Sequence, residues 1–327
     1  MRAWQFDEFG DYREVLKWRE VPSPQPGKDQ ALLRVHAASI NFPDLLLVAG
    51  TYQFKPPLPA TPGIEAVGRV VEVGEDSTLK VGDRVMAFAT GGGAFADQML
   101  TEQGKSFPVP TGMSDYDAAS MLTTYQTSYV GLVHRARLQR GETLLVHGAA
   151  GGVGISAIQL GKILGAEVIA TASSAEKLKI CRRVGAQHVI NYREDDFVSA
   201  VKDITGGRGA DVIYDPVGGE VFDRSSKCIA WEGRILVIGF TSGRIPDIAA
   251  NRILLKNMSV VGLFWGSYLV HNAGLMTKVH AELASLYQRG EIRPVIHSTI
   301  PMQQLIEGLE GVKSRETYGK VVLYNDP

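Results

Sequence analysis

The chain has 327 residues, a length that favours two domains because single hydrophobic cores stop growing near roughly 250 to 300 residues. With 45% hydrophobic and 21% charged residues, the composition is that of a globular protein and excludes disordered, collagen-like and low-complexity classes. The 34 Lys and Arg residues balance 35 Asp and Glu residues, so the net charge of -1 argues against nucleic acid or an anionic membrane as the main partner.

The first part of the chain consists of short alternating runs that Gly and Pro interrupt, a pattern typical of an antiparallel, β-barrel-like domain. Strands are predicted at residues 31–39, 65–73, 82–88 and 95–100.

After a helical segment near 115–138, short apolar strands alternate with helices, which is typical of a parallel, doubly wound sheet. The predicted strands are 143–147, 167–171, 188–191, 212–215, 234–238 and 259–265. The predicted helices are 153–164, 175–184 and 220–229. A last helix over 272–288 and a strand over 320–324 follow. We expect this tail to fold back on the first domain, which gives domains of 1–123 with 266–327 and of 124–265, sharing an interface with a cleft.

Only two cysteines, Cys181 and Cys228, are present, too few for a disulfide framework or a four-thiolate zinc site. The start of the chain does not resemble a secretory signal, and no segment approaches the ~18 consecutive apolar residues of a spanning helix. These features predict a soluble, cytoplasmic protein in a reducing compartment.

The strongest local signal is a glycine-rich turn between a predicted strand and an apolar helix. In such a turn the free N–H groups and positive dipole end of the helix hold a pyrophosphate, and small residues permit close backbone approach. Ala149 replaces the first glycine of the usual pattern. The residues predicted to bind the dinucleotide here are Ala150, Gly151, Gly152, Val153 and Gly154.

The end of the second predicted strand indicates which dinucleotide is bound. An NAD site usually places a carboxylate there, about 20 residues beyond the glycine turn, to bind the ribose hydroxyls. This chain has Ser173 and Ser174 instead, with Lys177 close by, and these side chains favour the 2'-phosphate of NADPH. Glu176 is nearby but falls in the next helix, and Lys177 would also be compatible with an ordinary solvated lysine.

Four segments, 41–44, 59–68, 149–154 and 189–192, together resemble the zinc-independent quinone oxidoreductases of the medium-chain dehydrogenase/reductase superfamily. The resemblance implies an α/β protein with a GroES-like β-barrel catalytic domain and a Rossmann domain that binds NADPH. It also implies that Lys177, Tyr192 and Arg315 surround the 2'-phosphate.

The same resemblance allows a comparison with the zinc-binding positions of the superfamily's zinc enzymes. The position after Gly63, a histidine in the zinc enzymes of this superfamily, is Ile64, and the connection 90–94 is too short for a structural zinc lobe. The seven histidines are scattered, so no tetrahedral ligand set is predicted. His147, at the mouth of the glycine turn, is interpreted as structural.

Without a Lewis acid, the hydride must go to an acceptor that is already electrophilic, such as a quinone or an α,β-unsaturated carbonyl. Asn41 is predicted to bind the cofactor or the acceptor oxygen, and Asp44 to hold its loop. Tyr52 has a spacing that resembles that of a catalytic tyrosine in enoyl thioester reductases, so we consider it a general acid, or else a pocket wall or cofactor contact. Leu46 replaces the family's other pocket tyrosine and makes the site less polar.

Residues at the ends of later strands are expected to flank the nicotinamide. They are Gly239, Phe240, Phe264 and Trp265, of which Trp265 is also compatible with interface packing. Thr127 is likewise expected near the nicotinamide. The run 259–264 is a plausible edge strand, and in related enzymes this edge pairs across a two-fold axis, so a homodimer is expected.

Two other functions stay open at this stage. The chain could be an enoyl-CoA or enoyl thioester reductase, which would need a channel for a long phosphorylated arm. Some relatives serve as lens crystallins or bind RNA, but the near-neutral charge and the lack of basic, aromatic-rich clusters argue against RNA as the main partner.

Overall fold

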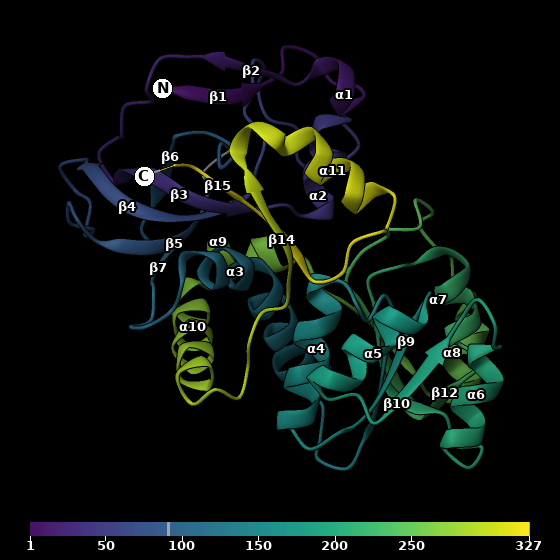
Figure 1. The fold of residues 1–327 in the computed structure, drawn as a ribbon. Helices are drawn as coiled ribbons and strands as arrows, with labels where there is room; N and C mark the ends of the chain where they lie inside the picture. Colours follow the sequence, from purple (N-terminus) through teal and green to yellow (C-terminus); the bar gives the residue numbers. More distant parts are fainter. Residues whose placement is uncertain (90–91, 327) are drawn as a thin grey trace. The chain divides into compact units, whose positions relative to one another are not determined.

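The computed structural model describes residues 1–89 and 92–326, which divide into two compact units (Figure 1). Unit 1 comprises Met1–Thr123, Asn272–Ala284 and Pro294–Pro327, and unit 2 comprises Thr124–His271 and Ser285–Arg293. The sequence assigned 266–327 entirely to the first domain, whereas 266–271 and Ser285–Arg293 group with unit 2. The segment Ser285–Arg293 is tied to unit 2 by two hydrogen bonds. The Gln159 side chain donates to the carbonyl of Arg293 and accepts from its N–H.

Unit 1 is built on a seven-stranded sheet of order β14-β15-β3-β4-β5-β7, with β6 also paired to β3. All its pairs are antiparallel except β14 with β15. The strands are β3 (Gln30–Ser39), β4 (Glu65–Val73), β5 (Arg84–Phe88), β6 (Gln98–Glu102), β7 (Ser106–Pro108), β14 (Ile296–Pro301) and β15 (Lys320–Tyr324). A separate hairpin pairs β1 (Arg2–Gln5) with β2 (Lys17–Glu20).

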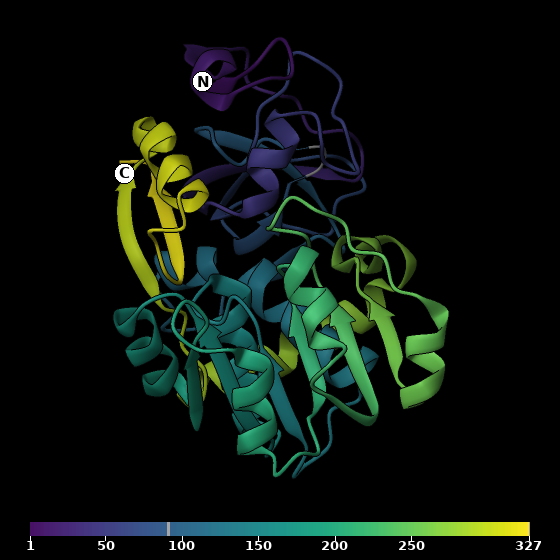
Figure 2. The same ribbon diagram turned by 90° about the vertical axis from the view of Figure 1, so that its right-hand side faces the viewer.

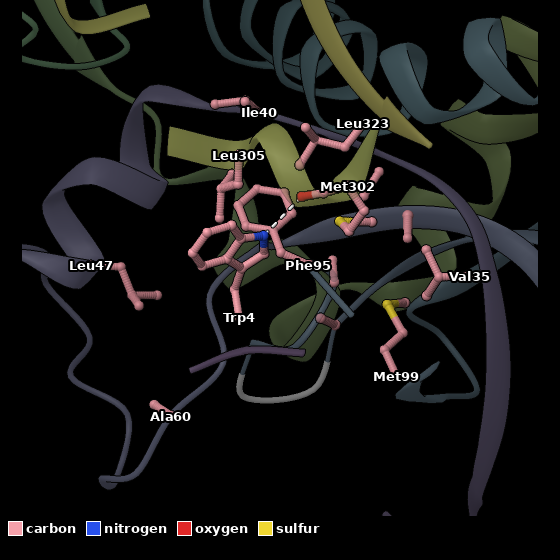
Figure 3. Close-up of a cluster of buried hydrophobic side chains, with 14 of the residues drawn as sticks. Trp4, Val35, Ile40, Leu47, Ala60, Phe95, Met99, Met302, Leu305 and Leu323 are labelled. Carbon is pink, nitrogen blue, oxygen red and sulfur yellow. Dashed lines mark hydrogen bonds between the residues drawn. The ribbon is translucent and has the colours of Figure 1, made fainter. Parts of the chain in front are cut away.

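The predicted strand at 95–100 begins later in the structure, at Gln98. The reason is local: the N–H of Phe95 bonds the carbonyl of Pro62, so Phe95 belongs to a loop. Phe95 is fully buried there and packs in the core of unit 1 with Trp4, Met302 and Leu305 (Figure 3). The indole N–H of Trp4 donates to the carbonyl of Met302 at 2.8 Å, which satisfies the one polar atom of this large buried side chain.

The helices within unit 1 are α1 (Tyr12–Val15), α2 (Phe42–Val48) and α11 (Leu305–Lys313). α11 lies against the C-terminal strands β14 and β15, drawn in yellow in Figure 2. Gly308 permits this approach because a Cβ there would lie 3.1 Å from Ile300 of β14 and 3.5 Å from Val321 of β15. α2 follows β3 directly, with Asn41 as its N-cap and Pro43 in its first turn. This junction positions the polar residues described below.

Unit 2 is built on a parallel six-stranded sheet of order β10-β9-β8-β11-β12-β13, which confirms the predicted doubly wound fold. The strands are β8 (Thr143–Val146), β9 (Glu167–Ala172), β10 (His188–Asn191), β11 (Ala210–Asp215), β12 (Ile229–Val237) and β13 (Ser259–Gly262). The strand order reverses between β8 and β11, the place where such sheets bind ligands beyond the carboxyl ends of their strands.

The helices of unit 2 connect these strands. They are α4 (Gly152–Ile163), α5 (Ala175–Val184), α6 (Phe197–Ile204), α7 (Gly219–Ser225), α8 (Ala250–Lys256), the 3-10 turn η2 (Trp265–Ser267) and α9 (Tyr268–His271). The helix predicted over 220–229 ends earlier because Ile229 already belongs to β12. The strand predicted over 259–265 ends at Gly262, and Trp265 begins η2.

Two helices supply residues to both units: α3 (Asp115–Tyr129), continued by the π-helix η1 (Val130–Arg135), and α10 (Ala273–Gln288). The single helix predicted near 115–138 is therefore two helical types in series. Among the described residues, no helix combines the length and apolar character needed to cross a membrane.

Candidate functional site

The glycine-rich turn after β8 has the geometry of a phosphate-binding loop. His147 continues the sheet by donating its N–H to the carbonyl of Tyr214. Gly148 then turns the chain with a φ of 55°, a conformation that favours glycine, and accepts a hydrogen bond from the N–H of Gly151. The sequence analysis gave Gly148 no role, yet Gly148 makes the tight turn that precedes Ala149.

Gly154 allows the first turn of α4 to pack directly on this loop. A Cβ at Gly154 would lie 2.6 Å from the Cα of Ala149 and from two backbone oxygens, closer than real contacts permit. The first intrahelical bond runs from Ile155 to Gly151, so the N–H groups of residues 152–154 precede the helical ladder. Gly151 is exposed and Gly152 half-buried, which leaves this positive helix end accessible to a phosphate.

The residues predicted for the 2'-phosphate gather at the ends of β9 and β10. Ser174 caps α5 by accepting the N–H of Lys177 at 3.4 Å. The N–H of Tyr192 donates to the carbonyl of Ala172, which places the end of β10 beside Ser173. Glu176 points to solvent from the first turn of α5. Ser173, Ser174, Lys177 and Tyr192 thus lie on the segments that follow β9 and β10 in unit 2, and the end of β9 carries no acidic residue.

Arg315, the remaining residue predicted for this phosphate, lies in unit 1 just after α11. It adopts a left-handed backbone with a φ of 59° and is exposed. Its participation in the phosphate site stays a prediction.

The loops after β11 and β12 are tied together at the same edge of the sheet. Asp215 accepts the N–H groups of Val217 and Gly218, and burial raises the pKa of its carboxyl. Gly218 also makes room for Phe240, because a Cβ there would lie 2.8 Å from that ring. Gly239 and Phe240 are therefore held in a defined loop at the carboxyl end of β12.

The other residues predicted near the nicotinamide differ in exposure. Phe264 is 54% exposed, whereas Trp265 is buried. Thr127 is buried in α3, next to Gln126. Sequence reasoning missed Gln126, which is 1% exposed and has no partner for either amide atom among the described residues. Its polar side chain within a buried helical run was the available signal, and such an orphan amide calls for water or a ligand.

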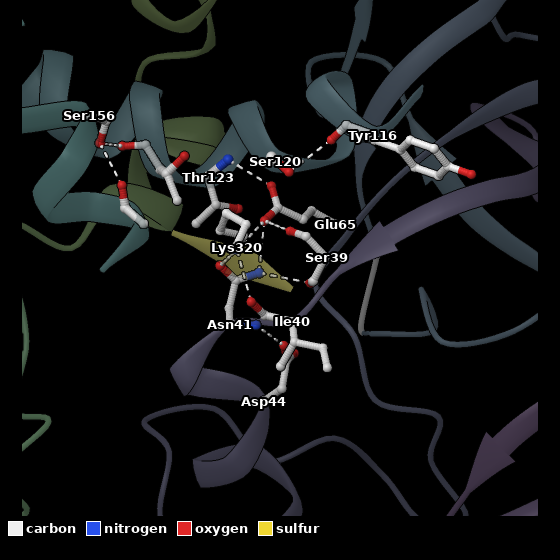
Figure 4. A network of polar contacts seen from close by, with 12 residues as sticks. Ser39, Ile40, Asn41, Asp44, Glu65, Tyr116, Ser120, Thr123, Ser156 and Lys320 are labelled. Carbon is white, nitrogen blue, oxygen red and sulfur yellow. Dashed lines mark hydrogen bonds and ion pairs between the residues drawn. The ribbon is translucent and has the colours of Figure 1, made fainter. Parts of the chain in front are cut away.

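A buried cluster of polar groups lies in unit 1 where β3 meets α2 (Figure 4). The Glu65 carboxylate accepts hydrogen bonds from the Ser39 hydroxyl, the Asn41 amide and the N–H of Thr123. The Lys320 ammonium lies 3.4 Å from Glu65 and donates to the Asn41 side chain. Asn41 and Glu65 fell within the segments that carried the resemblance, but the sequence analysis did not identify the Glu65–Lys320 pair.

Asp44 holds the loop, as predicted, because its carboxylate accepts the N–H of Asn41 at 2.7 Å. The side chain is fully buried, and this burial raises the pKa of its carboxyl to about 7. Tyr52 is half-buried against the same core, and its N–H bonds the carbonyl of Leu46. Burial, and secondarily the charge of Asp44, raises the pKa of the Tyr52 phenol, so it keeps its proton at neutral pH.

His147 behaves as a structural residue. Its two ring nitrogens bond the hydroxyls of Thr171 and Ser225 within unit 2. Burial lowers the pKa of the imidazole to about 3, so the ring stays neutral over the physiological range. A neutral imidazole with both nitrogens occupied is unsuited to act as a catalytic base.

Metal-binding groups were sought over residues 1–89 and 92–326. In that part of the chain, no three His, Cys, Asp or Glu side chains gather as a metal site would require. Ile64 is half-buried at the position expected for a zinc histidine. Thr90 and Gly91, part of the short connection 90–94, lie outside the described residues.

Comparisons with known proteins agree with this arrangement. Residues 27–111 match the alcohol dehydrogenase GroES-like domain, and residues 152–281 match the zinc-binding dehydrogenase family. A quinone oxidoreductase-like protein 2 homolog from Nematostella vectensis is 40% identical over 91% of this chain and 82% of its own. The Escherichia coli quinone oxidoreductase complexed with NADPH superposes with a TM-score of 0.93 at 31% identity, covering 99% of this chain and 100% of that one. The CurF ER cyclopropanase from the curacin A biosynthetic pathway gives a TM-score of 0.88 at 28% identity, with 99% and 98% coverage.

Proposed function

The chain belongs to the quinone oxidoreductase family of the medium-chain dehydrogenase/reductases, and from this premise we propose that it is an NADPH-dependent reductase of quinones or α,β-unsaturated carbonyls. The observation that carries the cofactor choice is the corner formed by Ser173, Ser174, Lys177 and Tyr192. Hydroxyls and an ammonium at the end of β9 suit a 2'-phosphate, and a carboxylate that would repel it is missing from that position. We include Arg315 in this phosphate site.

When bound, NADPH supplies the hydride, and the protein's part is to bind, orient and protonate. The N-terminus of α4, from Gly151 to Gly154, would hold the pyrophosphate. Phe240 and Phe264, which follow β12 and β13, and Thr127 of α3 would border the nicotinamide. Asn41 would bind the cofactor.

Tyr52 is the proton donor in this proposal. Reduction of an activated alkene leaves an enolate, which needs a hydrogen bond and then a proton. The raised pKa of the Tyr52 phenol keeps the proton available at neutral pH. A quinone yields a more delocalised anion and depends less on this donor.

We propose that the reaction proceeds without a metal. Two observations support this proposal. Ile64 occupies the position of a zinc-binding histidine, and the described residues include no group of three side chains that could bind a metal. Incubation with a strong chelator is expected to leave turnover unchanged. Activity that is lost on chelation and restored by zinc would contradict the proposal.

The experiment that tests the function is a steady-state assay of the full chain with NADPH and NADH as donors. 1,4-Benzoquinone, a simple enone and crotonyl-CoA serve as acceptors. We expect a clear preference for NADPH and turnover on the first two acceptors. Equal use of NADH and NADPH, or no turnover on any acceptor, would overturn the proposed function.

The enoyl thioester reductase is the second candidate, and Tyr52 is the observation that favours it. The likeness to the CurF ER cyclopropanase shows that this fold also hosts a protein named for other chemistry. A kcat/KM for crotonyl-CoA well above that for the enone would decide for this alternative.

We also propose a homodimer through the edge strand β13. Val260 on this strand is 36% exposed, and Leu254 and Leu255 on the neighbouring α8 are 72% and 69% exposed. An edge strand beside exposed apolar side chains is a surface that natural proteins usually cover. Val260→Glu is expected to convert a dimer into a monomer in light scattering, and a wild-type monomer would refute the dimer.

We propose a cytoplasmic location because both cysteines are free thiols. Cys181 and Cys228 are free and buried, and burial raises the pKa of each thiol to about 12. Such thiols need no oxidising compartment and react slowly with reagents that attack thiolates. A fluorescent fusion in the native host would test the location.

A further inference from the structure

The carboxamide of Asn41 is fixed in one orientation. Its Nδ2 donates to Oε1 of Glu65 at 2.8 Å and to the carbonyl of Ser39 at 3.2 Å. Its Oδ1 accepts from the Lys320 ammonium at 2.6 Å. A carboxylate can only accept and an ammonium can only donate, so these two charged neighbours determine which amide atom is oxygen and which is nitrogen.

Lys320 and Glu65 are themselves held from several sides. In addition to its bond to Asn41, the Lys320 ammonium donates to the carbonyl of Ile40 at 2.9 Å and lies 3.4 Å from the Glu65 carboxylate. The second Glu65 oxygen accepts the N–H of Thr123 in α3 at 2.8 Å. Both side chains are almost fully buried, at 1% exposure for Glu65 and 5% for Lys320. The end of β3, the start of β4, α3 and the start of β15 thus meet at one ion pair (Figure 4).

This arrangement limits what Asn41 can do. Both hydrogens of its amide nitrogen are engaged, so the side chain cannot donate to an acceptor carbonyl without losing a bond to Glu65 or Ser39. Its oxygen has two lone pairs, and Lys320 takes one. The N–H of Asp44 bonds the backbone carbonyl of Asn41 at 3.0 Å, so the second lone pair of the side-chain oxygen is assigned to a ligand. A flipped amide would turn its NH2 toward the ammonium and its oxygen toward the carboxylate, which replaces two charge-assisted bonds with two repulsive contacts.

We propose that Lys320 and Glu65 are positioning residues that present the Asn41 oxygen to a hydrogen-bond donor of the cofactor, a ribose hydroxyl or the nicotinamide carboxamide. The acceptor's carbonyl oxygen is then bound by other groups. The inference rests on the proposed NADPH function and narrows the expectation that Asn41 binds either the cofactor or the acceptor.

The central variant replaces both charged partners, Glu65→Gln with Lys320→Met, so that no unpaired charge stays buried. NADPH affinity, followed by the fluorescence of the bound cofactor, is expected to fall about tenfold, as for a lost charge-assisted contact. Affinity for 2',5'-ADP should stay within twofold, because that fragment binds only the phosphate corner and lacks the nicotinamide ribose. A purely structural role would lower thermal stability and leave the ratio of the two affinities unchanged.

Asn41→Ala provides a second variant that leaves the ion pair intact and should show the same selective loss. Glu142→Gln with Arg234→Met removes the half-buried ion pair of unit 2 and serves as the matched control, with no change in either affinity expected. Unchanged NADPH affinity in Asn41→Ala, or in a folded double variant of the central pair, overturns the proposal.

An analogue of NADPH with an acetyl group in place of the carboxamide distinguishes the two donors. If the amide is the donor, wild type prefers NADPH over the analogue and Asn41→Ala loses that preference. If a ribose hydroxyl is the donor, Asn41→Ala weakens both cofactors equally. A wild-type protein that binds no NADPH would refute the proposed function itself, a result separate from every variant comparison.

Discussion

The backbone N–H of Tyr192 donates to the carbonyl oxygen of Ala172 at 3.2 Å. This bond extends the parallel pairing of β10 with β9, in which Asn191 lies opposite Ala172, and brings the residue that follows β10 to the place where β9 ends. The phenol of Tyr192 is 43% exposed at this corner, so its ring is accessible to a ligand. The backbone pairing therefore sets the geometry of the phosphate corner.

Lys177→Ala is expected to raise the KM for NADPH about 10- to 100-fold and to leave the KM for NADH nearly unchanged, because only NADPH carries the 2'-phosphate. Steady-state kinetics with both cofactors checks this. Lys179→Ala, on the exposed side of the same helix, is the matched control and should behave as wild type. Equal effects on NADPH and NADH would show that Lys177 does not contact the phosphate.

Gly154→Ala is expected to lower the free energy of unfolding by about 1–3 kcal/mol and to weaken NADPH binding, because the new methyl collides with the backbone of the phosphate loop. Urea denaturation and fluorescence titration measure the two effects. In Gly274→Ala the new Cβ meets nothing within 4 Å, so this α10 variant should be neutral or slightly stabilising. Two variants of equal stability would contradict the role given to Gly154.

Tyr52→Phe is expected to reduce kcat on an enone about 100-fold and on 1,4-benzoquinone much less, because only the enolate requires a proton from the phenol. Tyr116→Phe, an exposed tyrosine of unit 1, is the control. If Tyr52→Phe turned over both acceptors at wild-type rates, Tyr52 would be a pocket wall.

Asp44→Asn tests the buried carboxyl through the pH dependence of stability. The pKa of Asp44 is raised from 3.8 to about 7, so between these values the folded protein binds a proton that the unfolded chain releases. The wild-type free energy of unfolding should therefore fall relative to that of Asp44→Asn as pH rises from about 4 to 7, by at most about 1.4 kcal/mol per pH unit. Denaturation of both proteins at several pH values measures this difference. A constant difference would show that the carboxyl has an ordinary pKa.

Gln126→Leu is expected to leave the free energy of unfolding unchanged or to raise it, because the buried amide has no partner among the described residues. Gln159→Leu should lower it by about 1–3 kcal/mol, since Gln159 bonds the Tyr125 hydroxyl and the backbone of Arg293. Urea denaturation of the ligand-free proteins compares them. Equal losses in both variants would indicate that Gln126 has a bonded partner in solution.

The sequence predicted most of unit 2, because a parallel sheet repeats a local pattern. The helix over 175–184 and the strands over 188–191 and 320–324 have the predicted bounds, since caps and glycines mark their ends. The predicted bound of β13 was wrong because an apolar run continues beyond the strand to Trp265, and that of α7 was wrong because Ile229 already begins β12. Periodicity alone cannot separate a strand from the buried turn that follows it.

The Glu65–Lys320 pair was inaccessible to the same reasoning for a different reason. Each residue lies at the start of a strand, where a charged side chain is ordinarily exposed, and only the pairing of β15 with β3 brings Lys320 near the strand that carries Glu65. By contrast, Ser174 and Lys177 lie within one helical turn, so their proximity follows from spacing. Local contacts were predictable, and those that depend on tertiary pairing were not.

Glu65 and Lys320 are separated by 255 residues in the chain, and this separation affects how the protein is made. At about 5–20 residues per second, a ribosome needs roughly ten to fifty seconds between them. The nascent β strands at the N-terminus wait through that interval with a carboxylate that has no counterion, while the Rossmann sheet is completed behind them. The sheet of unit 1 is therefore expected to reach its final pairing only after β15 has been synthesised, because that strand carries the partner of Glu65.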